Sequence, residues 1–72
     1  MTEKQFLVKL DIRIKQLRTD QDLSQNAFGN EIEMEKSNVS RLESGKVNPR
    51  VATLLKVAKA LQIRLSDLLD LE

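Results

Sequence analysis

Apolar residues recur at helical spacing near the start of the chain. Phe6, Leu10, Ile14 and Leu17 follow one another at intervals of four, four and three residues, so they share one face of a helix. This pattern predicts a first helix over about residues 4–20, with that face turned toward a core. Polar residues of low helix propensity then end the pattern.

A short second helix is predicted over about residues 25–32. Ser24 belongs to the residue types that cap helix N-termini, and Phe28 and Ile32 lie four residues apart on one helix face. Because Gly29 has no side chain, another helix can approach this one closely. The sequence therefore predicts a second helix packed tightly against its neighbour.

A third short helix is predicted over about residues 36–44, where Val39 and Leu42 are the only large apolar residues and Gly45 is a stop signal. At about 100° per residue, these two residues define an inner side that also includes Glu43. The outer side is small, hydroxylated and basic, and it carries Ser37, Ser40, Arg41 and Ser44, flanked by Lys36 and Asn38. Another molecule can approach such a face closely.

Two further helices are predicted, over about residues 51–61 and 65–71. The apolar face of the fourth helix consists of Val51, Leu54, Leu55, Ala58 and Leu61, all expected to be buried. The fifth helix offers Leu65, Leu68, Leu69 and Leu71, which is more apolar surface than one short terminal helix needs. The predicted fold is therefore a compact all-α domain of five helices over residues 1–72, with part of the fifth helix in an interface.

Composition narrows the possible chemistry. The chain has no Cys, His or Tyr and no Gly-rich phosphate loop, so neither a metal site nor a cofactor is expected, and so small a core leaves little room for a substrate cleft. These features argue against an enzyme. No apolar stretch is long enough to span a membrane, and no secretory signal begins the chain, so we expect a cytoplasmic protein.

The formal net charge is only +1, but positive charge gathers in residues 36–50, which contain four cationic residues and one acidic residue. A local excess of this kind either faces phosphates or is an ordinary solvated helix surface. Charge alone does not decide between these interpretations.

Several spaced motifs carry a resemblance to a known family. They are Leu17-Arg18, Leu23-Ser24-Gln25, residues 37–46, Asn48-Pro49 and residues 53–61. From Leu10 to Leu69 the chain resembles the lambda repressor and Cro-like helix-turn-helix family, which includes small phage repressors and restriction-modification controller proteins. The resemblance implies a sequence-specific transcriptional regulator that binds double-stranded DNA and has no small-molecule ligand.

In such proteins the second of two short helices enters the major groove. The resemblance therefore implies that the helix over 36–44 reads DNA, with contacts from Lys36, Ser37, Asn38, Ser40 and Arg41. It also implies contacts from Gln25 at the start of the preceding helix, and from Lys46 and Asn48 to the DNA backbone. For each residue the alternative is ordinary solvent exposure, and the sequence does not separate contacts to bases from contacts to phosphates.

The resemblance also implies a structural ion pair between Arg18 and Glu43, because in this family an Arg late in the first helix forms an ion pair with a Glu late in the third helix.

Some residues depart from the family pattern, which usually has Gly at positions 33 and 62 and a capping Ser or Thr at positions 35, 50 and 64. Here these positions hold Glu33, Gln62, Glu35, Arg50 and Arg64. We expect a left-handed backbone at Glu33 and poor capping by the two arginines.

One helix in one groove reads few base pairs, so a homodimer on a pseudo-palindromic operator is expected. Its predicted interface is formed by Leu65, Leu68, Leu69 and Leu71 with exposed parts of the first helix. The alternative function is a protein-interaction module, such as an antitoxin or adaptor, that retains the helix-turn-helix shape.

Overall fold

The computed structural model describes residues 1–71, and over these residues the chain forms helices without strands. The helices are α1 (Glu3–Asp20), α2 (Gln25–Glu31), α3 (Lys36–Leu42), α4 (Val51–Ala60) and α5 (Leu65–Leu68). The predicted all-α fold of five helices is confirmed. The predicted starts of α2, α3, α4 and α5 agree with the structure, but their predicted ends lie one to three residues too late, because the chain leaves the helix there in a C-cap or a turn.

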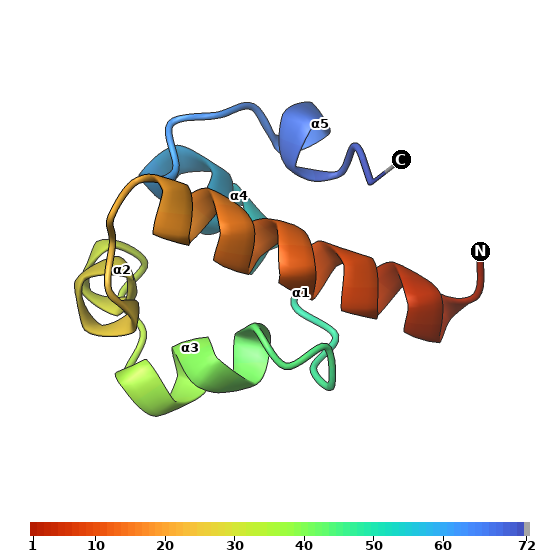
Figure 1. Ribbon diagram of the computed structural model, residues 1–72, viewed down its shortest axis with the longest axis horizontal. Coiled ribbons are helices and arrows are strands. Elements are labelled where there is room, and N and C mark those ends of the chain that lie inside the picture. The colour runs from red at the N-terminus through yellow and green to blue at the C-terminus, as the bar shows by residue number, and fades with distance from the viewer. Residues whose placement is uncertain (72) are drawn as a thin grey trace.

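Helix α1 is the central element around which the other helices are arranged (Figure 1). In that view α3 lies on one side of α1 and α5 on the opposite side, with α2 at the C-terminal end of α1. Leu10 and Ile14 of α1 are buried, and Phe6 and Leu17 pack against the same core. The apolar stripe predicted from the spacing in residues 4–20 is thus the inner face of α1.

The core is completed by side chains from the remaining helices. Buried members include Phe28 and Ile32 from the α2 region, Val39 and Leu42 from α3, Leu54, Val57, Ala58 and Leu61 from α4 and its C-cap, and Leu68 from α5. Every helix therefore contributes to one apolar cluster. Because the chain is short, this cluster and a few polar contacts must hold the fold together.

Helices α2 and α3 approach each other closely at Gly29. A Cβ atom placed on Gly29 would lie 2.3 Å from the carbonyl oxygen of Met34, in the turn that leads to α3. The backbone N–H of Met34 also donates to the Gly29 carbonyl at 2.8 Å. This contact fixes the turn between the two short helices, as the absence of a side chain at Gly29 predicted.

Three leucine or valine positions differ from the sequence-based prediction. Val51 and Leu55 are 64% and 52% exposed, whereas both were expected to be buried. Val51 stands in the first turn of α4, and Leu55 lies about 100° around the helix from the buried Leu54. Leu68, expected in an interface, is fully buried because α5 turns back onto the body of the protein.

The C-terminal segment is also tethered by polar contacts. Arg13 of α1 donates from its Nε and one Nη to the carbonyl oxygen of Asp67, at 3.0 and 2.8 Å. Gln21 donates to the carbonyl oxygen of Leu61 at 2.8 Å. These bonds satisfy carbonyl groups at or near the ends of α4 and α5 and hold both helices against α1.

Turns between helices use left-handed backbone at residues other than glycine. The φ angles of Asp22, Glu33 and Gln62 are 57°, 56° and 60°. The left-handed conformation expected at Glu33 is confirmed, and Gln62 occupies another position where the related family usually has Gly.

Among the described residues, no helix is long and apolar enough to span a lipid bilayer.

Candidate nucleic-acid interface

Helix α3 turns the side described from the sequence toward solvent. Val39 and Leu42 are 0% and 5% exposed, so they attach α3 to the core. All the predicted contact residues of this helix are exposed: Lys36, Ser37, Asn38, Ser40 and Arg41. Ser44, just beyond the helix, is exposed as well. The structure therefore brings these side chains together on one accessible surface.

A buried ion pair joins the C-terminal end of α1 to the C-terminal end of α3. The guanidinium of Arg18 donates from Nε to Oε2 of Glu43 at 2.6 Å and from Nη2 to Oε1 at 3.0 Å. Its Nη1 donates to the carbonyl oxygen of Leu23 at 2.7 Å. Both residues are only 7% exposed, so the two bonds that join them lie in a region from which water is largely excluded.

Gln25 differs from the other predicted contact residues because it has a partner inside the protein. It begins α2, is half-buried, and donates from Nε2 to Oε1 of Glu43 at 3.1 Å. Gln25 therefore extends the Arg18–Glu43 pair into a network that connects α1, α2 and the end of α3. The side-chain amide keeps a second N–H and its oxygen for another partner.

The ion pair also changes the charge that the third helix presents. Glu43 is the one acidic residue in the basic segment 36–50, and it is turned inward against Arg18. The cations of this segment, Lys36, Arg41, Lys46 and Arg50, are all exposed. The acidic Glu35 lies at the N-cap of α3, where a negative charge is favoured by the helix dipole. The surface along α3 and the following loop is therefore cationic.

The loop after α3 is held by its own hydrogen bonds. The hydroxyl of Ser44 donates to the carbonyl oxygen of Arg41 and accepts from the backbone N–H of Lys46 at 3.3 Å. Lys46 and Asn48 are exposed on this loop. The loop thus leads the chain from the end of α3 to the start of α4 with both predicted contact residues accessible.

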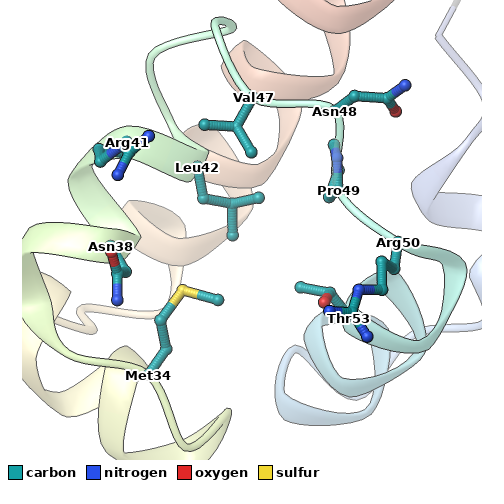
Figure 2. Close-up of a pocket in the computed structure, with 9 residues that line it drawn as sticks. All are labelled: Met34, Asn38, Arg41, Leu42, Val47, Asn48, Pro49, Arg50 and Thr53. Carbon is teal, nitrogen blue, oxygen red and sulfur yellow. The ribbon is translucent and has the colours of Figure 1, made fainter.

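A pocket of about 290 Å³ lies between α3 and this loop (Figure 2). Met34, Asn38, Arg41 and Leu42 line it on one side, and residues 47–50 with Thr53 line the other. Polar and cationic groups therefore face each other across a partly apolar depression beside α3.

Asp11 is an acidic residue that the sequence reasoning did not single out. Its Oδ1 is buried and has no hydrogen-bond partner within residues 1–71. Burial, together with the nearby charge of Glu43, raises the pKa of Asp11 above its ordinary value of 3.8, and Lys15 partly opposes this change. Asp11 also lies next to Gly45, at the beginning of the loop that follows α3.

The part of the chain that the structure describes contains no group of three or more acidic, His or Cys side chains arranged to hold a metal ion. The concentration of cationic and hydroxyl groups on one helix and its following loop instead provides donors for an anionic polymer. The arrangement consists of two short helices, α2 and α3, joined by a tight turn, with the second helix exposed.

A family comparison identifies this arrangement. Residues 14–68 match the sequence profile of a helix-turn-helix family. The chain belongs to this helix-turn-helix family. Its members are DNA-binding transcriptional regulators and controllers, not enzymes.

Individual relatives agree with the family match. The control protein C.MunI of a Mycoplasma species is 34% identical over 62 residues, which are 85% of this chain and 84% of the relative. The crystal structure of the restriction-modification controller protein C.AhdI from Aeromonas hydrophila matches 86% of this chain and 94% of its own, with a TM-score of 0.82 and 35% identity. The resemblance to this family inferred from sequence motifs is confirmed.

A longer helix-turn-helix protein shares the same fold. A transcriptional regulator of this family from Vibrio cholerae has a TM-score of 0.85 at 28% identity. It matches 93% of this chain, which spans 38% of that protein. The arrangement of helices therefore recurs both in a protein of similar length and as part of a larger one.

Sequence reasoning missed two residues that border the helix-turn-helix surface. Asp11 lies in the polar part of the α1 pattern, which carries no signal that a carboxylate will become buried beside Glu43. Arg50 was recognised only as a poor helix cap, although it lines the pocket next to α3. Its position after the basic loop was the signal available in the sequence.

The buried pair is expected to dominate the stability of the helix-turn-helix. Replacing Arg18→Ala leaves the Glu43 carboxylate buried without its cation, and such changes typically lower the free energy of unfolding by about 3–5 kcal/mol. Lys56→Ala is the matched control, since Lys56 and Glu33 are 4.0 Å apart with side chains 55% and 82% exposed. The control is expected to cost less than about 1 kcal/mol. Equal unfolding midpoints in urea for the two variants would contradict this ranking.

The raised pKa of Asp11 predicts a pH-dependent gain from Asp11→Asn. Well below pH 3.8 the aspartate is neutral in both folded and unfolded chains, so the variant and the wild type should be equally stable. As the pH rises through the folded-state pKa, the wild type acquires an unfavourable buried charge that asparagine lacks. The variant should therefore become the more stable protein toward neutral pH, as measured by urea unfolding at a series of pH values. A difference that does not change with pH would contradict this assignment.

Proposed function

We propose that this protein is a sequence-specific transcriptional regulator that places α3 in the major groove of double-stranded DNA. The observation that carries the proposal is the orientation of α3. Its two apolar side chains and Glu43 face the body of the protein, and Lys36, Ser37, Asn38, Ser40 and Arg41 face solvent. A major groove about 12 Å wide accommodates a helix, and short side chains allow close approach to base edges.

Arg41 and Asn38 are proposed to read bases. Arginine donates two hydrogen bonds to O6 and N7 of guanine, and asparagine forms a similar pair with adenine. Both residues are exposed on the pocket side of α3 (Figure 2). The hydroxyl groups of Ser37 and Ser40 are less selective, and Lys36 is suited to either a base edge or a phosphate.

Gln25, Lys46 and Asn48 are proposed to contact the sugar–phosphate backbone. Lys46 and Asn48 belong to the loop that leaves α3, and Gln25 stands at the start of α2 next to the end of α3. Contacts of this kind fix the position of the protein along the duplex without reading the sequence. Gln25 then serves two purposes, because its amide also donates to Glu43.

We further propose that the protein acts as a homodimer on a pseudo-palindromic site. Leu68 is excluded from the interface because it is buried in the core, so the proposed surface consists of Leu65, Leu69 and Leu71 together with Ile12 of α1. Ile12 is 56% and Leu69 36% exposed, and Ile12 and Leu71 line one groove between α1 and the C-terminal segment. Two-fold symmetry would separate the recognition helices by about 34–36 Å, one turn of DNA.

The DNA-reading role is tested by selecting binding sites from random duplexes and then measuring Arg41→Ala. Loss of a bidentate contact is expected to cost about 1–3 kcal/mol on the selected site and to relax the preference at one base pair. Arg64→Ala, which removes an exposed cation from the N-cap of α5, is the control and should bind like the wild type. If wild-type binding to DNA is absent or shows no salt dependence, the alternative of a protein-interaction module is favoured.

The dimer is tested by sedimentation of Leu69→Asp and Leu55→Asp. Both substitutions place a charge on an exposed leucine, one beside α5 and one on α4. A charge in an apolar interface is strongly unfavourable, so Leu69→Asp should shift the population to monomer and Leu55→Asp should not. A wild-type monomer at micromolar concentration, or dissociation by Leu55→Asp alone, would contradict the proposed surface.

A further inference from the structure

Arg50 occupies a position that does not favour the stability of its own helix. It is the N-cap of α4 and makes no side-chain capping hydrogen bond. Ser, Thr, Asp and Asn are the residues that stabilise this position, and the positive end of the helix dipole disfavours a cation there. Helix stability therefore gives no reason for an arginine at the start of α4.

A second arginine, Arg64, is also a helix N-cap, but a nearby carboxylate compensates its charge. Arg64 is the N-cap of α5, and its Nε lies 3.5 Å from Oδ2 of Asp67. The backbone N–H of Arg64 also donates to Asp67 at 3.4 Å. Within residues 1–71, Arg50 takes part in none of the ion pairs. The charge of Arg50 is therefore uncompensated where the charge of Arg64 is compensated.

The surroundings of Arg50 indicate the kind of anion that would bind to its side chain. Arg50 lines the pocket opposite Asn38 and Arg41, next to Asn48 and Thr53 (Figure 2). Leu42 and Val47 supply apolar surface between these polar groups. The pocket thus combines two cations and neutral hydrogen-bonding groups with an apolar wall, which suits a ligand that alternates charged and apolar units.

The backbone of DNA is such a ligand, and its place relative to α3 follows from groove geometry. A helix with side chains is about 10–12 Å wide and the major groove about 12 Å, so the phosphate chains bordering the groove must pass directly beside the helix. We infer that the pocket between α3 and α4 seats the sugar–phosphate backbone of one strand, with Arg50 bound to a phosphate. Thr53 and Asn48 supply neutral hydrogen bonds, and Leu42 and Val47 face a deoxyribose. This inference rests on the proposed function, because it assumes that α3 enters the major groove.

The test compares Arg50→Ser with Arg64→Ser. Each variant loses one positive charge and gains a capping residue. Because Arg50 has no ion pair to lose within the described part of the chain, the melting temperature of Arg50→Ser should rise by about 4–8 °C. Binding of Arg50→Ser to a selected operator should weaken about tenfold per half-site at 50 mM salt, and binding to random duplex should weaken equally. The slope of log K against log salt should fall by about 0.9 per half-site. Arg64→Ser should change neither affinity nor slope.

Neutral methylphosphonate groups placed one at a time along the operator identify the phosphate. One substitution per half-site should weaken the wild type about tenfold and leave Arg50→Ser unchanged. If the wild type binds DNA but Arg50→Ser retains its affinity and salt slope, the pocket assignment is wrong while the proposed function stands. A loss confined to the operator and absent on random duplex would instead make Arg50 a base-reading residue and would also overturn the assignment. If the wild type does not bind DNA, the proposed function itself fails.

Discussion

The ion pair between Arg18 and Glu43, together with the burial of Val39 and Leu42, holds the third helix with its cationic side outward. A seven-residue helix is marginal by itself, and Val39 and Leu42 are the two residues of α3 that are buried. Glu43 adds a third attachment on the same side of the chain, and its two oxygens meet two nitrogens of one guanidinium. Since a bidentate pair is directional in a way that apolar contact is not, it fixes the rotation of α3 about its axis.

Burial of this pair has an energetic cost that the surrounding groups offset. Each charge loses water on entering the protein, and the mutual attraction compensates only when the remaining donors and acceptors are satisfied. Here the carbonyl oxygen of Leu23 accepts from the third nitrogen of Arg18, and Gln25 donates to Glu43. The same network therefore aligns α1, α2 and α3, so the geometry of the helix-turn-helix and its attachment to the core have one origin.

Sequence periodicity predicted the elements well where a helix has one clearly apolar side. The inner faces of α1 and α3 follow directly from the spacing of Leu10, Ile14, Val39 and Leu42. Periodicity does not reveal how far the core extends along or around a helix, which is why Val51 and Leu55 were wrongly expected to be buried. It also does not reveal that a terminal segment folds back, so the buried Leu68 was mistaken for part of an interface.

Polar positions were harder to predict because their meaning depends on neighbours distant in sequence. Nothing near Asp11 in the sequence indicates that burial raises the pKa of its carboxyl group, or that Glu43, at the end of α3, lies close enough to add to this rise. The Arg18–Glu43 pair was inferred only through the family resemblance, together with the inward position of Glu43 on the helical wheel. Contacts that join separate helices thus required either three-dimensional coordinates or knowledge of related proteins.

The helix starts divide into two groups, according to whether the side chain of the N-cap residue accepts a hydrogen bond. Thr2 and Ser24 cap α1 and α2 with side-chain hydrogen bonds at 3.1 and 3.0 Å. Helices α3, α4 and α5 begin without such bonds. At α5 the carboxylate of Asp67 accepts from the backbone N–H of the N-cap residue Arg64, whereas α3 and α4 border the cationic pocket. A capping residue typically contributes about 1 kcal/mol to the stability of a helix. The starts of α3 and α4 lack this contribution, on the side of the protein where its uncompensated cations are concentrated. Binding of an anionic partner on that side would recover the lost stabilisation, because only the folded chain presents those groups together.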